Sequence, residues 1–474
     1  FNVQGFDVSM VSRLINSRPF EAENSLELSL SKSFLQLEAT LRPPFPLSIP
    51  NSQQYSCLNE AILFGVLTEP KWSKIHIKHL HGIVNDGYGL YSSLNTRLVN
   101  ELYEKLIESV KVQLLWSVKQ IVAVLGIGCA DLLGSLFRRI YAGDMRDENL
   151  WLSYELAHLL LHNINSFLED EPAILCNGLY VFLRILSDHC RVTVDSKVDS
   201  LKSLEIEFCV KVIREHFHLC LKLGRDFVRL LHDLFHVPEF KSIWRDLIQS
   251  PSNFKTPKFS DISQLYCVRT SSSYHLLRIP PEMEIQLRFM MMHVKFGNHQ
   301  RHQIWFAKKF LNDHGRRSSI VDIVRFICCG HHPTNETLQS NVTPRWAIIG
   351  WLLQMCDKHY ILSNAKLALF YDWLFFDEGV DNIMNIEPGM LLIVFSVPKH
   401  MEMVHSLLEF LVIVLENYDV ERKSIVQKGL VSSVDSLVKK QVIVSLSVFL
   451  SCSSFSPSIK EKLEKLLIGF NMES

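Results

Sequence analysis

The sequence has no excess charge of one sign and no long apolar run. Its 474 residues carry 49 Lys and Arg against 50 Asp and Glu, a formal net charge of -1 with His neutral. A protein that grips nucleic acid by itself needs clustered basic residues to neutralise phosphates, so this balance disfavours that class. No apolar run approaches the ~18 residues of a membrane-spanning helix, and we therefore expect no membrane partner.

Glycine, proline and paired cysteines are also scarce. The 19 Gly and 17 Pro fall slightly below average usage, which disfavours turn-rich sandwiches and barrels. The 11 cysteines are odd in number and mostly lie inside apolar patterns, which is typical of a reducing compartment. The chain begins at Phe1 rather than at methionine, and we expect it to be a segment of a longer protein.

Apolar residues recur at helical spacing along most of the chain. Leu98, Leu102, Leu106 and Val110 begin one such stripe. Breaks at Gly or Pro follow at intervals of about twenty residues, and helix pairs of about forty residues are the unit of HEAT and armadillo arrays. The sequence therefore predicts an all-α fold, an irregular HEAT/armadillo-like α-solenoid of helix pairs in two lobes.

Two stretches rich in proline and serine predict the boundaries between the parts of this array. Residues 41–56 contain four prolines, and residues 250–281 combine SPSNFKTPKF with a run of three serines and a Pro-Pro pair. We predict an N-terminal helical segment with a Pro-rich joint at 1–56 and an N-terminal helical lobe at 57–250. An inter-lobe linker at 251–281 and a C-terminal helical lobe at 282–474 complete this division.

The strongest candidate for a metal site is the run Cys328-Cys329-Gly330-His331-His332. Thiolates and imidazoles bind zinc, but adjacent ligands on a helix project in different directions and no C-x-x-C spacing completes a tetrahedral set. The alternative is a helix C-terminus capped by Gly330. We also find no convergent base and nucleophile, so we expect no metal, no cofactor, no catalytic residue and no enzyme activity.

Residues 344–376 form the densest apolar and aromatic block. Asp372 lies inside this block, where an isolated carboxylate is costly, and Lys366 or Arg345 could supply its counter-charge. GRDFVRLL at 224–231 is interpreted as a polar seam between packed helices. The residues to which we assign structural roles are Arg225, Asp226, Arg229, Trp346, Trp351, Asp372 and Trp373.

Basic pairs leave an alternative open, a direct single-stranded nucleic-acid-binding helical-repeat protein. Trp305-Phe306 beside Lys308-Lys309 could stack a base. Nearby acids or apolar residues dilute each basic pair, which favours solvated helix faces instead.

Five stretches between 224 and 388 carry a family resemblance: GRDFVRLL (224–231), PEFKSIWRDLI (238–248), PRWAIIGWLL (344–353), SNAKLALFYDWLFF (363–376) and IMNIEP (383–388). Together they resemble the N-terminal domain of the Integrator complex subunit 3 family. The same family is also named for the sensor of single-stranded DNA (SOSS) complex, of which it is a component.

The resemblance implies a non-enzymatic scaffold. It would bind an OB-fold single-stranded-DNA-binding subunit together with a small accessory subunit, and link them to other Integrator subunits. Nucleic acid would then be contacted indirectly, through the OB-fold subunit. The resemblance further implies roles in the DNA damage response, DNA repair and snRNA processing, in the nucleus and also in the cytoplasm.

No motif identifies the partner contacts directly. We predict them at Arg138, Tyr141, Asp144 and Trp151, where an aromatic, a charge and a glycine lie in a loop between two helices, a combination typical of an anchor site. The alternative is that Trp151 packs inward.

Overall fold

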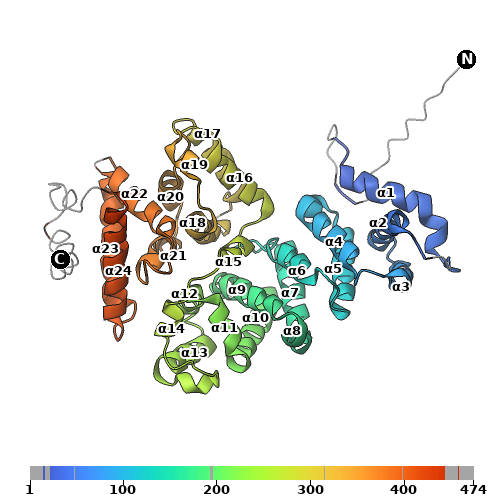
Figure 1. The fold of residues 1–474 in the computed structure, drawn as a ribbon, viewed down its shortest axis with the longest axis horizontal. Helices are drawn as coiled ribbons and strands as arrows, with labels where there is room; N and C mark the ends of the chain where they lie inside the picture. The colour runs from blue at the N-terminus through green and yellow to red at the C-terminus, as the bar shows by residue number, and fades with distance from the viewer. Residues whose placement is uncertain are drawn as a thin grey trace, which may run out of the picture. The chain divides into compact units, whose positions relative to one another are not determined.

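The computed structural model describes residues 14–16, 22–46, 49–192, 196–313, 315–397 and 399–443, with position 457. Within these ranges the chain forms 24 α-helices with short 3-10 turns and no named strand (Figure 1). Sequential helices pack against one another along the chain, as α1 does on α2 and α23 on α24. The prediction of an all-α helical-repeat fold is therefore confirmed. None of these described helices is both long and apolar enough to cross a bilayer.

The chain divides into two compact units. Unit 1 contains Phe1–Arg139 and Asn165–Ile174, and unit 2 contains Ile140–Ile164 and Leu175–Ser474. The predicted boundaries at residues 56, 250 and 281 stay predictions. The described part of the predicted linker contains two short helices, α14 and α15, and buries Phe254, Leu265 and Tyr266.

Unit 1 is built around α2. Asn51 caps this helix, because its side chain accepts from the Gln54 backbone N–H while the Gln54 side chain accepts from the Asn51 N–H. The helix packs against α1, α3, α4 and α5, with the Phe34 and Phe64 rings 5.3 Å apart. The helices of this unit are α1 (Ser25–Leu37), α2 (Ser52–Thr68), α3 (Ser73–Ile83), α4 (Gly89–Leu102), α5 (Glu108–Ala123), α6 (Cys129–Phe137) and most of α8 (Ile164–Asp170).

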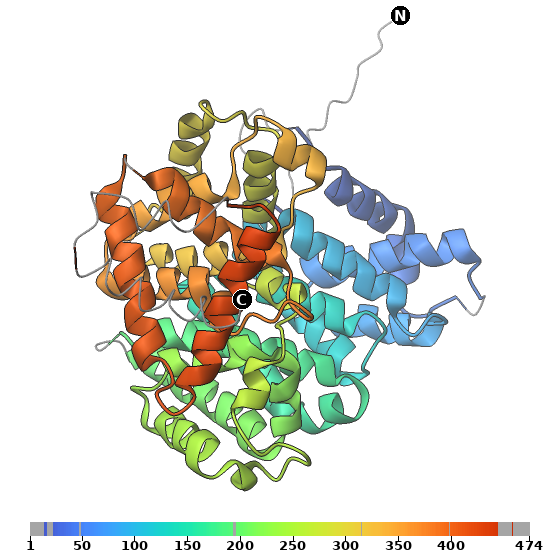
Figure 2. The ribbon, with the colours of Figure 1, turned by 60° about the vertical axis from the view of Figure 1, so that its left-hand side comes forward.

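Unit 2 begins with longer helices, several of which start where the sequence signals a start. Pro238 and Pro281 occupy the first turns of their helices, where a missing N–H is tolerated. Figures 1 and 2 show the course of the chain. The helices up to residue 292 are α7 (Asp147–His162), α9 (Pro172–His189), α10 (Ser196–Glu215), α11 (Phe217–Leu223), α12 (Arg225–Asp233), α13 (Pro238–Gln249), α14 (Ser263–Tyr266), α15 (Ser272–Leu277) and α16 (Pro281–Met292).

The second half of unit 2 ends in the antiparallel pair α23 and α24 (Figure 2). Next to it, α22 packs on both α20 and α23, and α21 packs on α18 and α23. These helices are α17 (His299–Phe310), α18 (Ile320–Arg325), α19 (Asn335–Gln339), α20 (Arg345–Gln354), α21 (His359–Phe370), α22 (Glu387–Ser396), α23 (Met401–Asn417) and α24 (Lys423–Lys439). A π-helical turn, Phe326–Gly330, extends α18.

Helix α9 lies in the core of unit 2. The consecutive residues 179–183 are all at most 2% exposed. A helix that is apolar around its whole circumference must be covered on every side. The described core of unit 2 therefore forms around α9, and its few polar groups need partners from other helices.

Candidate interaction site

Three arginines and three aspartates form a buried ionic cluster inside unit 2. Arg325 bridges two carboxylates, with Nη1 2.9 Å from Asp372 Oδ2 and Nη2 2.6 Å from Asp226 Oδ2. Arg225 joins Asp372 at 3.3 Å and Asp381 at 3.0 Å. Arg229 Nε lies 2.6 Å from Asp226 Oδ1. The formal charges balance, so each side chain finds its counter-ion inside the fold.

These arginines keep the buried carboxylates ionised. Burial alone raises the pKa of Asp372, but Arg325 and Arg225 hold that pKa below its usual value. In the same way Arg325 and Arg229 outweigh burial at Asp226 and strongly lower its pKa. The cluster joins α12, α18, the turn after α21 and the loop at 381, so it fixes how these segments pack.

The partner expected for Asp372 is wrong. The Lys366 Nζ donates to the Ser406 carbonyl at 3.1 Å, and the Arg345 Nη2 pairs with Glu387 at 2.6 Å. Asp372 is neutralised instead by Arg225 and Arg325. The nearest cations in sequence were not the nearest in space, because helix packing brings α12 and α18 to this carboxylate. Trp373 is 1% exposed, whereas Trp346 and Trp351 are half-buried.

His275 makes the free energy of unfolding depend on pH. Its Nδ1 lies 3.2 Å from the Tyr180 hydroxyl and its Nε2 3.9 Å from Asp226 Oδ2, with Arg325, Arg229 and Asp372 also nearby. Burial lowers the pKa of His275 to about 4, although Asp226 opposes this shift. Only the unfolded chain then binds the proton as pH falls through about 6.5, so stability is lost between there and about pH 4.

We expect His275→Gln to remove up to about 3 kcal/mol of this acid-dependent loss. Urea unfolding at a series of pH values measures it as a smaller slope of the free energy of unfolding against pH. The matched change His359→Gln, at an exposed position, should keep the parent slope. An unchanged slope in His275→Gln would contradict the assignment.

The Cys-His run lies where α18 passes through its π-helical turn. Cys328 and Cys329 are buried, and the Cys329 Sγ donates to Asp372 Oδ2 at 2.9 Å. Burial raises the pKa of both thiols, which keeps them protonated. His331 Nδ1 accepts from Arg288 at 2.8 Å, and His332 Nε2 contacts Asn385 Oδ1 at 2.9 Å. These side chains therefore point to separate protein partners.

The four residues predicted to contact a partner fall in both units. Arg138 caps the C-terminus of α6 in unit 1. In unit 2, Asp144 is fully buried, with Arg316 at 2.6 Å and Arg146 at 2.8 Å. The Arg316 guanidinium also lies 4.6 Å from the centre of the Tyr141 ring, and Trp151 is half-buried on α7. Their role in partner binding stays a prediction.

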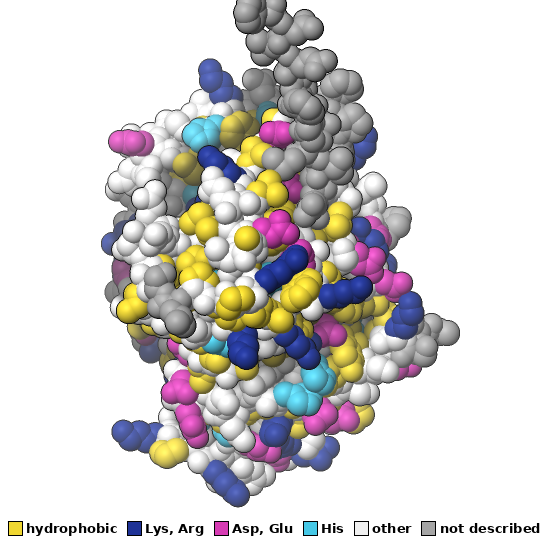
Figure 3. Space-filling model, turned by 90° about the vertical axis from the view of Figure 1, so that its right-hand side faces the viewer, with side chains coloured by type: hydrophobic (Ala, Val, Ile, Leu, Met, Phe, Trp, Pro, Cys, Tyr) yellow, Lys and Arg dark blue, Asp and Glu magenta, His cyan; other side chains and the backbone are white. Residues whose placement is uncertain are grey.

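The surface offers no large patch of one charge on the face drawn in Figure 3. Basic, acidic and apolar side chains are interspersed there. In the Trp305-Phe306 pair, Phe306 lies in the core and only Trp305 is exposed, with Lys309 Nζ 5.1 Å from its ring centre. A base-stacking platform would therefore consist of Trp305 alone at this position.

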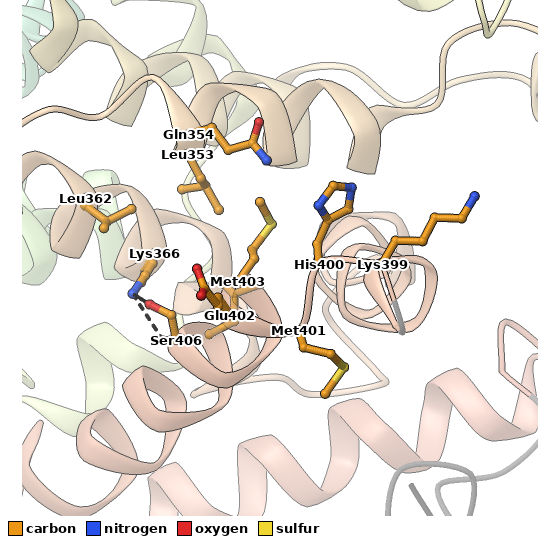
Figure 4. Close-up of a pocket in the computed structure, with 11 residues that line it drawn as sticks. Leu353, Gln354, Leu362, Lys366, Lys399, His400, Met401, Glu402, Met403 and Ser406 are labelled. Carbon is orange, nitrogen blue, oxygen red and sulfur yellow. Dashed lines mark hydrogen bonds between the residues drawn. The ribbon is translucent and has the colours of Figure 1, made fainter. Parts of the chain in front are cut away.

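Sequence reasoning missed an open groove of about 920 Å³ on unit 2. Its walls come from α17, the segment before α20, α20 itself and the end of α22. An adjoining hollow of about 580 Å³ continues it along the start of α23 (Figure 4). Gln354, Lys399, His400 and Met403 line both hollows, so the two form one groove. We call it the α20–α23 groove.

Aromatic side chains form one side of the α20–α23 groove. Trp346 stacks on Phe395 with ring centres 5.0 Å apart, and Phe296 meets the Trp346 ring edge-on at 5.9 Å. The loop that carries Phe296 is fixed, because the Phe296 N–H donates to the Asn341 carbonyl at 2.9 Å. Phe296, Ile304 and Phe395 remain 44%, 70% and 55% exposed. Contiguous exposed apolar side chains of this kind mark interaction sites.

Helix pairs, a charge-balanced core and an exposed apolar groove define a helical-repeat protein with surfaces suited to binding macromolecules. The family model described as Integrator complex subunit 3 N-terminal matches residues 53–465. The chain belongs to this family.

Individual relatives agree with the family match. The chain is 34% identical over 435 residues to Integrator complex subunit 3 of Mus musculus, covering 88% of this chain and 41% of that protein. It is 32% identical over 468 residues to the Drosophila grimshawi homolog, covering 97% and 42%. The Dictyostelium discoideum homolog is 36% identical over 406 residues, covering 85% and 27%. The chain thus spans less than half the length of these relatives.

Proposed function

We propose that this chain is a non-enzymatic scaffold of the Integrator complex. It binds an OB-fold single-stranded-DNA-binding subunit together with a small accessory subunit, and it links them to other Integrator subunits in the nucleus. The relatives are named as Integrator complex subunit 3, which supports assembly with Integrator. In this proposal the chain supports the DNA damage response and snRNA processing by placing the DNA-reading subunit near its machinery.

The exposed groove is the observation that carries this proposal. A scaffold needs surfaces on which other proteins can bury apolar side chains, and the α20–α23 groove provides one. The near-neutral net charge supports indirect rather than direct contact with nucleic acid, because an OB-fold subunit brings its own basic groove and aromatic platforms.

Co-purification tests the proposal. We expect the tagged chain, co-expressed with the OB-fold and accessory subunits of the same organism, to retain both through size-exclusion chromatography. Trp151→Ala tests the predicted contact at Arg138, Tyr141, Asp144 and Trp151, with its melting temperature as the check on folding. Elution of the chain without either subunit would refute the scaffold role.

A titration of the chain alone separates the scaffold from a direct nucleic-acid binder. In fluorescence anisotropy with a labelled single-stranded DNA, we expect only weak binding by the isolated chain. Tight binding that weakens steeply with salt would instead identify a protein that neutralises phosphates itself.

A further inference from the structure

The α20–α23 groove combines a rigid aromatic wall with a cationic end. Stacked rings at Phe296, Trp346 and Phe395 hold one another in place, so little conformational entropy is lost when a ligand packs on them. Gly350 brings α20 close to α22, since a Cβ there would lie 2.9 Å from the Leu392 Cδ1. The wall is therefore preformed. It is also open, because Phe395 and Ile304 are more than half exposed.

The charges along the groove favour an anion. No carboxylate is among the described residues that line the larger hollow, whereas Lys399 and His400 lie where the two hollows join. Lys366 lies on the wall of the smaller hollow, and only 9% of it is exposed. Its Nζ contacts the Ser406 carbonyl and hydroxyl oxygens (Figure 4), and within the described part of the chain it forms no ion pair. The exposed Glu402 is the one acidic side chain lining this hollow.

We propose that the α20–α23 groove binds an acidic amphipathic segment of a partner protein. Large apolar side chains of that segment pack on Phe296, Trp346 and Phe395, and its carboxylates face Lys399 and Lys366. A helix with apolar anchors at i, i+3 or i+4 and i+7 meets both demands, because one face is apolar while the flanking positions carry charge. Complementary charge fixes the orientation of such a segment and speeds its association.

This inference deepens the proposed function, on which it rests, by giving one surface of the scaffold a partner chemistry. The co-purification above asks whether the chain assembles at all. A peptide selection asks what the groove binds, so the two experiments can fail separately.

The test is selection of short random-sequence peptides, displayed on phage, against the complete chain. We expect the selected peptides to carry large apolar residues at helical spacing and a net negative charge. In fluorescence polarisation, Phe395→Ala and Lys399→Glu should each weaken a selected peptide by about tenfold, as the loss of one aromatic or charged anchor does. Added salt should weaken it further, because the charges are accessible to solvent.

Two variants away from the groove serve as matched controls. Val420→Ala removes another exposed apolar side chain, and Lys428→Glu reverses another exposed charge. Both should bind the peptide as the parent does, and melting curves should be the same for all four variants. Basic peptides, equal binding to all variants, or no groove-dependent peptide would overturn the proposal. Binding only after removal of residues 444–474 would also overturn it, because the groove would then belong to this chain's own tail.

Discussion

Replacing Arg325 by methionine is expected to lower the free energy of unfolding by about 3–5 kcal/mol. The change keeps much of the side-chain volume but leaves Asp226 and Asp372 with one arginine each. Removing one partner of a buried ionic cluster is this costly because an uncompensated charge stays in the core. Urea unfolding at neutral pH, followed by circular dichroism, measures the change.

The control for Arg325 is Lys439→Met. Lys439 pairs with Asp435 at 2.6 Å, but both side chains are exposed, so this change should lower stability by less than about 1 kcal/mol. Arg325→Lys should fall between the two, because one ammonium keeps the charge but lacks the fork that spans two carboxylates. Equal effects of Arg325→Met and Lys439→Met would show that the buried cluster adds nothing to stability.

Replacing Gly224 by alanine is expected to lower the free energy of unfolding by about 3 kcal/mol or more. Gly224 has φ 67° and ψ -152°, a conformation that is essentially restricted to glycine. A Cβ at this position would also lie 2.4 Å from the Val268 carbonyl oxygen. That carbonyl accepts from the Arg225 N–H at 2.8 Å, so the strain would spread to the residue that pairs with Asp372.

Gly82→Ala is the matched control. Gly82 lies within α3, and an added Cβ would have no neighbour within 4 Å. Alanine is the better helix former, so this change should raise stability by about 0.5–1 kcal/mol. Thermal and urea unfolding of both variants would show opposite signs. A neutral Gly224→Ala would mean that the 224 and 268 segments can separate without penalty.

The sequence was sufficient to predict the fold class because helices form from local interactions. Period and punctuation were enough to recognise helices, and the prolines at 238 and 281 mark true helix starts. Family identity was likewise predictable, since long ungapped motifs such as the one at 363–376 survive in single sequences. The family match over residues 53–465 confirms it.

Partners that are distant in sequence could not be predicted. Asp372 was expected to pair with Lys366 or Arg345, yet Arg225 is 147 residues away along the chain. The α20–α23 groove was missed for a similar reason. Its walls come from several helices, and periodicity does not tell whether Phe296 or Phe395 is covered by a neighbour. A possible signal was the aromatic content of 344–376, whose Trp346 and Trp351 line the groove.

The ionic cluster also restricts how the gene could be cut into fragments. Its members are spread from Arg225 to Asp381, so any break between these positions separates opposite charges that are buried together. A fragment from either side would have to expose or hydrate those charges, and its part of the core would not close. The interval 225–381 therefore folds cooperatively or not at all, and the smallest autonomous piece of unit 2 must contain all of it.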